Sequence, residues 1–178
     1  MQLLNVAPVR AEETALEGFD ARFRPLLVDG FRLARAILRD GQEAEDVLQE
    51  AALSAWRSYP RFRGDDGMAR AWFLTIVTNR CRSRLRSSWW KRRKAIGGDR
   101  SLERLEAQRH ETSIELRADL AVAVAQLTWD QRAVLYLYYE LDQPQDEVAR
   151  ILAIRVGTVK SRLSRAVKVL RTALAEDT

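Results

Sequence analysis

A basic segment near the C-terminus carries side chains suited to sequence-specific recognition. Residues 155–171 contain six Lys or Arg and no Asp or Glu. On a helix, the spacing i, i+3, i+4 and i+7 places four polar side chains on one face: Thr158, Ser161, Arg162 and Arg165. Arg can bond a guanine edge bidentately, while Ser and Thr can bond bases or phosphates. The segment therefore predicts a helix that reads the DNA major groove, although a solvated basic face would give the same pattern.

A second short helix is predicted just before this segment. Residues 146–152 show helical spacing with Val148, Ala149 and Leu152 facing inward. Three residues, 153–155, separate them from the basic helix, whose own apolar stripe is Val159, Leu163, Ala166 and Leu170. Two short helices joined by a tight turn, the second one basic, predict a helix-turn-helix. Ala153 stands where such turns often have glycine, so a positive φ there would be mildly strained.

Another basic region lies in the first half of the chain. Residues 79–94 hold eight Lys or Arg and no acid, within a helical pattern that begins near Met68. Their mutual repulsion would be relieved by a polyanion. Trp89 and Trp90 beside them could stack on bases or complete the core, and we favour the core because buried aromatic residues are common.

The loop 59–67 precedes this helix and is marked by Pro and two Gly. It offers aromatic rings and the guanidinium groups of Arg61 and Arg63, a mixture that suits an unstacked base. Phe62 could equally pack into the core. Further upstream, residues 43–58 form a helical pattern with Val47, Ala51 and Ala55 inward and an acidic outer face, for which plain solvation is the simplest interpretation.

Composition limits the classes of function. The 178 residues carry a net charge of +5, one cysteine, Cys81, and one histidine, His110. They offer no intrachain disulfide, little for a zinc site, no Gly-rich phosphate loop and only Asp65-Asp66 as adjacent loop acids. No apolar run is long enough to span a bilayer, and the N-terminus does not resemble a signal peptide. We therefore expect a cytoplasmic protein that is not an enzyme and needs no cofactor or metal.

The same patterns predict an all-α chain of two small helical domains. An N-terminal arm covers residues 1–15, a first helical domain 16–94, a flexible linker 95–111 and a second domain 112–178. Capping-box patterns at residues 112–115 and 128–131 mark helix starts in the second domain.

Three blocks of residues, in this order, resemble the extracytoplasmic-function (ECF) group of bacterial RNA polymerase sigma factors. Residues 45–51 with Trp56-Arg57 are similar to the helix of sigma domain 2 that grips the polymerase clamp. Residues 62–65 followed by 72–79 resemble the loop and helix that engage the −10 element, and residues 156–166 resemble the −35 recognition helix of sigma domain 4. The resemblance covers about residues 17–174. Three departures are Thr128 for a usual Pro, residues 141–144 for a Gly-Leu-Ser-like stretch, and Ala153 for a turn Gly.

The resemblance implies a protein that binds core RNA polymerase and directs it to promoter DNA, with no membrane insertion. An anti-sigma factor is a further partner that such a protein can have. The implied −35 contacts are Thr158, Lys160, Ser161, Arg162 and Arg165. The implied −10 contacts are Arg61, Phe62, Arg63, Asn79, Arg82 and Arg86. The implied polymerase contacts are Asp46, Gln49 and Glu50.

Two other functions fit part of the chain. A stand-alone helix-turn-helix regulator would explain residues 112–178, but it leaves the first basic, aromatic-bearing domain unexplained. A sigma-like decoy that binds an anti-sigma factor would need no DNA contacts, whereas basic faces are present in both halves.

Overall fold

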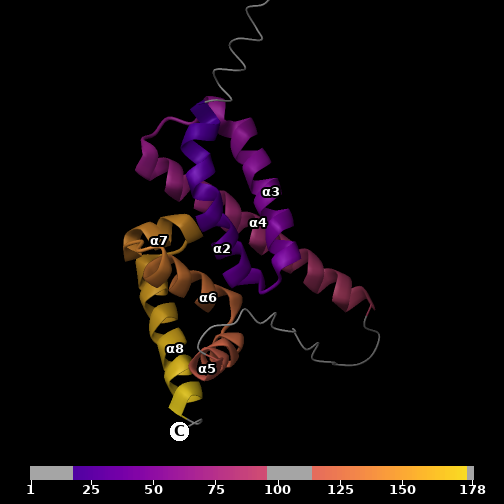
Figure 1. Ribbon diagram of the computed structural model, residues 1–178, viewed down its shortest axis with the longest axis vertical. Helices are drawn as coiled ribbons and strands as arrows, with labels where there is room; N and C mark the ends of the chain where they lie inside the picture. Colours follow the sequence, from indigo (N-terminus) through magenta and orange to yellow (C-terminus); the bar gives the residue numbers. More distant parts are fainter. Residues whose placement is uncertain (1–17, 96–113, 176–178) are drawn as a thin grey trace, which may run out of the picture.

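The computed structural model describes residues 18–95 and 114–175, and every regular element in these two ranges is helical (Figure 1). This confirms the predicted all-α class. The predicted arm 1–15 and, apart from Ala95, the predicted linker 95–111 lie outside the described residues, so the domain boundaries stay predictions. We call residues 18–95 the first unit and residues 114–175 the second unit.

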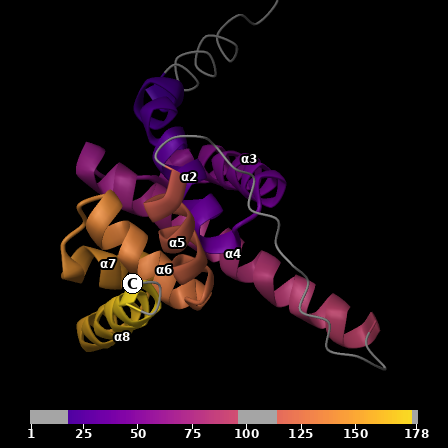
Figure 2. The same ribbon diagram turned by 60° about the horizontal axis from the view of Figure 1, so that its bottom comes forward.

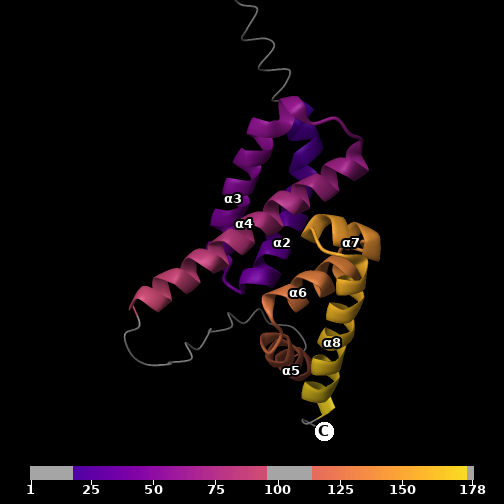
Figure 3. The ribbon, with the colours of Figure 1, turned by 180° about the vertical axis from the view of Figure 1, so that it is seen from behind.

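The first unit is built from three long helices that pack side by side (Figures 1 and 3). Residues 18–23 are helical, and Pro25 lies in a 3-10 turn, η1 (Arg24–Leu26). Then follow α2 (Leu27–Leu38), α3 (Gly41–Ser58), the 3-10 turn η2 (Tyr59–Arg61) and α4 (Asp66–Ala95). The predicted inward residues of α3 are buried, so this helical pattern is confirmed.

Gly30 of α2 leaves room for side chains of α3 and α4. A Cβ atom at this position would be only 2.8 Å from Cε1 of Phe73 and 3.1 Å from Cδ1 of Leu48. Glycine is therefore needed here for close approach of the helices, which outweighs its poor helix propensity. The last turns of α4 project away from the other helices (Figures 2 and 3).

The second unit consists of α5 (Ile114–Ala125), α6 (Trp129–Leu135), a π-helical turn η3 (Tyr136–Glu140), α7 (Gln145–Leu152) and α8 (Val156–Ala175). Thr128 caps α6 as predicted: its hydroxyl accepts a bond from the Gln131 amide, and the Gln131 side chain accepts one from the Thr128 amide at 2.8 Å. The departure from proline at this position thus preserves the helix start.

The turn between α7 and α8 adopts the strained conformation that the sequence predicts. Ala153 has φ 53° and ψ 49°, the left-handed region that glycine adopts without steric cost. The turn still satisfies the end of α7, because the Ile154 amide donates to the Ala149 carbonyl at 3.0 Å. The turn has the geometry of a glycine C-cap, but alanine occupies the position of the glycine.

We expect Ala153→Gly to raise the free energy of unfolding by about 0.5–1 kcal/mol, because relief of strain exceeds the added flexibility of the unfolded chain. Thermal and urea unfolding would measure this. Ala121→Gly, at an exposed position inside α5, is the matched control and should lower stability by about 1 kcal/mol. A loss of stability in Ala153→Gly would contradict the strain at this turn.

The two units share one hydrophobic core. Buried residues of α2, α3 and α4 are contiguous with buried residues of α6, α7 and α8. Helix α7 packs on α4, and α6 packs on α2 (Figure 2). The sequence predicts two domains joined by a linker, but nothing in the hydrophobic patterns predicts that they would pack on one another.

Cys81 is buried in this core as a free thiol, and burial raises its pKa to about 12. Among the described helices, none has the length and apolar character needed to cross a membrane. The described residues also contain no group of three potential metal-binding side chains.

Candidate nucleic-acid and polymerase interfaces

Helix α8 presents its basic side to solvent, as a DNA-reading helix must. Val159, Leu163 and Ala166 are buried and Leu170 is half-buried on the side of α8 that packs on α5, α6 and α7, which confirms the predicted stripe. On the other side Lys160 and Arg165 are exposed. Thr158 and Ser161 are half-buried, and the Ser161 hydroxyl donates to the Thr158 carbonyl at 3.0 Å. The structure therefore brings the predicted −35 residues to one helix, with the Ser161 hydroxyl engaged by the backbone of the helix itself.

Arg162 is held by an ion pair that the sequence did not predict. Its Nη1 lies 2.8 Å from Oδ1 of Asp130, in the first turn of α6, and both side chains are less than one-third exposed. A guanidinium has five donors in a planar fork, so this bond leaves others for a ligand. Asp130 thus fixes the direction of the Arg162 side chain.

The loop before α4 is anchored by aromatic packing. The Phe62 ring is half-buried and stacks on the Trp72 ring, with centroids 4.9 Å apart. Arg63 donates from Nη1 to the carbonyls of Pro60 and Phe62, whereas Arg61 is exposed. Of the two interpretations of Phe62 from sequence, packing against the core is the one seen in this structure.

Asn79 lies in a groove between α3 and α4. The groove has a volume of about 370 Å³. It is lined by Ser54, Ser58, Trp72, Ile76, Asn79, Arg80 and Ser83. The side chain of Ile76, the indole of Trp72 and the carboxamide of Asn79 can together hold a flat polar ring. The three loop residues predicted with Asn79, which are Arg61, Phe62 and Arg63, do not line this groove. Ser54 and Ser58 of α3 do line it, and the sequence did not indicate them because their spacing is that of an ordinary helix surface.

The remaining predicted −10 residues have different surroundings. Arg86 is exposed near the projecting end of α4. Arg82 is half-buried, donates to the Leu152 carbonyl at 3.0 Å and lies over the Trp129 ring at 5.6 Å. Both of these partners belong to the second unit. The side chains of Trp89 and Trp90 are outside the described part of the chain, and their assignment to the core stays a prediction.

The acidic face of α3 is partly neutralised by α4. Arg84 lies 3.2 Å from Glu43, 3.8 Å from Asp46 and 3.0 Å from Glu50. Asp46 and Glu50 remain about half exposed, and Gln49 is exposed. Arg80 also lies 3.7 Å from Glu50, so the three predicted polymerase contacts share one accessible surface with two arginines of α4 at its edge.

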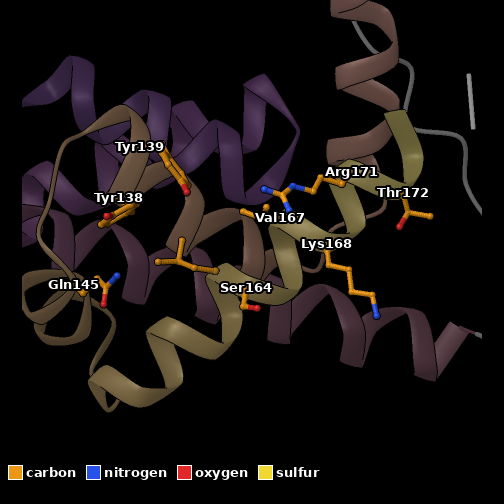
Figure 4. A pocket seen from close by; sticks show the side chains of 9 residues that line it. Tyr138, Tyr139, Gln145, Ser164, Val167, Lys168, Arg171 and Thr172 are labelled. Carbon is orange, nitrogen blue, oxygen red and sulfur yellow. The ribbon is translucent and has the colours of Figure 1, made fainter. Parts of the chain in front are cut away.

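A second groove runs along α8 and was not predicted. It has a volume of about 440 Å³. It is lined by Tyr138 and Tyr139 from the π-helical turn and by Ser164, Lys168 and Arg171 of α8 (Figure 4). A π-turn inside a helical pattern has no distinct periodicity, which is why sequence reasoning could not find this surface.

Two family models match the chain: sigma-70 region 2 over residues 21–91 and sigma-70 region 4 over residues 117–170. The ECF RNA polymerase sigma factor SigL of Mycobacterium tuberculosis is 37% identical over 149 residues, with 82% of each chain covered. This chain belongs to the ECF sigma factors. SigK of Mycobacterium bovis, another ECF sigma factor, is 31% identical, with 81% of this chain and 79% of SigK covered.

Solved structures agree with this assignment. The sigma factor RpoE of Bartonella quintana, solved with the anti-sigma factor NepR, matches 91% of this chain and 99% of its own with a TM-score of 0.72 and 25% identity. CnrH, solved with the cytosolic domain of CnrY, matches 93% of this chain and 91% of its own with a TM-score of 0.60 and 25% identity. As an ECF sigma factor, the protein binds core RNA polymerase and directs promoter-specific transcription, and sigma factors in general are regulators rather than enzymes.

Proposed function

We propose that this ECF sigma factor reads the −35 element with α8, engages the −10 element with α4 and the groove at Asn79, and binds polymerase through the acidic face of α3. The observation that carries the proposal is the helix-turn-helix of α7 and α8, which buries one stripe of α8 and leaves Lys160 and Arg165 exposed. The protein itself catalyses no bond chemistry in this proposal, and its place of action is the cytoplasm.

At the −35 element, α8 would lie in the major groove. Arg162, Thr158, Ser161 and Arg165 would meet bases and phosphates, with Lys160 on the backbone. Phosphate contacts position the helix and give salt-dependent affinity, while base contacts give specificity.

At the −10 element, an extruded base would enter the groove beside Asn79 and Trp72. Flipping a base costs a few kcal/mol, which stacking and hydrogen bonds in a pocket must offset. Arg86 would hold the nearby backbone, and Arg82 would join it after release from Leu152 and Trp129. Arg61 and Arg63 would flank the strand from the loop, and Phe62 would support the wall of the groove through Trp72.

We expect Asn79→Ala to weaken open-complex formation by about 1–3 kcal/mol, the range for a lost base contact. Permanganate footprinting of the −10 region, with reconstituted holoenzyme, would measure it. Ser83→Ala, one helical turn further along the same groove, is the matched control and should change little. Equal melting by Asn79→Ala and the parent protein would remove Asn79 from the −10 contacts.

At the polymerase, Asp46, Gln49 and Glu50 would offer an acidic surface to a basic coiled coil. Arg80 and Arg84, which pair with acids of this surface, would be displaced or would reorient on binding. An anti-sigma factor is a further proposed partner, supported by the likeness to RpoE, which was solved with the anti-sigma factor NepR.

Transcription by purified core RNA polymerase, with and without this protein, tests the proposal. Sheared genomic DNA at moderate salt should give discrete new start sites that share an upstream motif. A protein that shifts DNA alone, gives no new transcripts and does not bind core polymerase would instead be a stand-alone regulator. Binding only to an anti-sigma factor, with neither DNA nor core bound, would indicate a decoy.

A further inference from the structure

Arg22 contacts the segment just before α4 through three different groups. Its Nε lies 2.9 Å from Oδ1 of Asp66, the first residue of α4. Its Nη1 donates to the Gly64 carbonyl at 3.5 Å. Its guanidinium also lies over the Phe62 ring, with Cζ 5.9 Å from the ring centroid. One side chain from the helical residues before α2 thus contacts a carboxylate, a backbone carbonyl and an aromatic ring of residues 62–66.

The segment that Arg22 contacts forms no regular secondary structure between η2 and α4. Its start is fixed by the Phe62 amide, which donates to the Tyr59 carbonyl at 2.9 Å. Its end is fixed by the Asp65 carboxylate, which accepts a bond at 2.8 Å from an amide in the first turn of α4. Between these ends the backbone lies against the Phe62 ring, because a Cβ atom at Gly64 would be only 2.8 Å from Cζ of that ring. Arg22 therefore holds the middle of the segment, where backbone and ring lie together.

The Phe62 ring connects Arg22 to the groove at Asn79. This ring stacks on the Trp72 ring with centroids 4.9 Å apart, and Trp72 lines the groove. A base in the groove would lie beside Trp72, so the place of the Phe62 ring decides where that wall of the groove stands. A recognition site keeps its selectivity only when the residues behind it hold it within about 0.5 Å.

Global stability is a poor explanation of the Arg22 contacts. The Asp66 side chain is 88% exposed, and an ion pair with so exposed a partner adds little to the free energy of unfolding. The distance to the Phe62 ring is close to the outer limit of about 6 Å for a cation–π pair. Loops open locally at low free-energy cost, so weak contacts are enough to select one conformation of this segment.

We propose that Arg22 is a positioning residue for −10 recognition: it fixes residues 62–66 and, through the Phe62 ring, the wall of the groove that accepts the extruded base. The inference rests on the proposed function, because it takes the groove at Asn79 as the site of that base. Arg22 itself contacts no base. Its loss leaves the groove present but less sharply shaped, so that other bases are accepted more readily.

The experiment measures base preference with the full-length chain in reconstituted holoenzyme. The probe is a promoter that carries the shared motif from the transcription experiment, with each −10 position replaced in turn by the other three bases. Rates of open-complex formation give the preference at each position, which we expect to be roughly 5- to 150-fold for a base that is read directly. The position whose preference is lost in Asn79→Ala is the one that the groove reads.

Two substitutions of Arg22 separate its charge from its shape. Arg22→Met removes both and should lower the preference at the groove position about fivefold, within the range for residues that share partners. Arg22→Lys keeps the charge without the planar fork and should restore only part of the preference. Arg24→Met is the matched control and should equal the parent, because this exposed arginine pairs with Asp20, 2.8 Å away and one helical turn earlier.

Circular dichroism and thermal unfolding of each variant show whether it is folded. Should Arg22→Met fail to fold, Arg22→Lys and Asp66→Asn provide the same comparison. Asp66→Asn removes the partner of the ion pair, and it should lower the preference at the groove position in the same direction by a smaller factor.

A loss of preference at the groove position, with preferences at the −35 element unchanged, supports positioning by Arg22. Equal weakening for all four bases, with the slope of log K against log salt concentration lowered by about one, would instead make Arg22 a phosphate contact and overturn the proposal. Lower thermal stability with base preference intact would overturn it as well, because the role would then be structural only. If Asn79→Ala changes no preference in an active holoenzyme, the assignment of the groove to the −10 base fails, and the role of Arg22 fails with it.

Discussion

Replacing Phe23 with alanine should lower the free energy of unfolding by about 3–5 kcal/mol, the usual cost of deleting a buried aromatic ring. Phe23 is 1% exposed and lies at the centre of an aromatic cluster. Its ring stacks on Phe19 at 4.6 Å and meets Tyr59, Trp72 and Phe73 edge-on within 6 Å. This one substitution would therefore remove the ring that the other four aromatic residues share as a packing partner, next to the loop before α4.

The loss is a large part of the stability of a typical domain, about 5–15 kcal/mol. For a chain of this length it corresponds to a fall in Tm of roughly 6–20 °C. Calorimetry and urea unfolding would measure it, with Phe23→Leu as the control that keeps most of the buried volume and should cost far less. A change below about 1 kcal/mol in Phe23→Ala would show that the cluster repacks without its central ring.

Replacing Arg162 with alanine should reduce −35-dependent initiation by about 1–3 kcal/mol, or roughly 5- to 150-fold, if its fork bonds a base edge. The pair with Asp130 strengthens this expectation. One donor of the guanidinium is fixed at 2.8 Å and the side chain is only 23% exposed, so the remaining donors are already oriented. An oriented side chain loses less conformational entropy on binding, so more of the contact energy contributes to affinity.

The decisive measurement is a double-mutant cycle in which one change is made in the protein and the other in the promoter. Initiation by Arg162→Ala and the parent protein is compared on a promoter with its −35 element and on one with that element scrambled. The defect should nearly vanish on the scrambled promoter. Lys160→Ala should instead weaken binding on both promoters. It should also lower the slope of log K against log salt concentration by about one, as expected for the loss of a phosphate contact. Unchanged promoter affinity in Arg162→Ala would remove this residue from the −35 contacts.

Local patterns of the sequence are enough to determine the helices and the family. The stripe of Val159, Leu163 and Ala166 predicts the buried side of α8, and the short pattern before it predicts α7. Even the positive φ of Ala153 follows from its place in the turn. These features depend on residues close together in the chain, where helical periodicity and capping chemistry act directly. The charge distribution along the sequence likewise indicates both basic helices.

Tertiary structure alone decided which of the predicted side chains are available. Arg162 pairs with Asp130, Arg84 with the acids of α3, and Arg82 with the end of α7. In sequence these arginines look equally free, because charge and spacing do not reveal a partner 32, 34 or 70 residues away. The packing of the two units likewise depends on contacts between residues that are far apart in the sequence. An arginine that binds main-chain carbonyls at a helix end leaves no pattern in the acceptor's side chains, since every residue supplies the same carbonyl group.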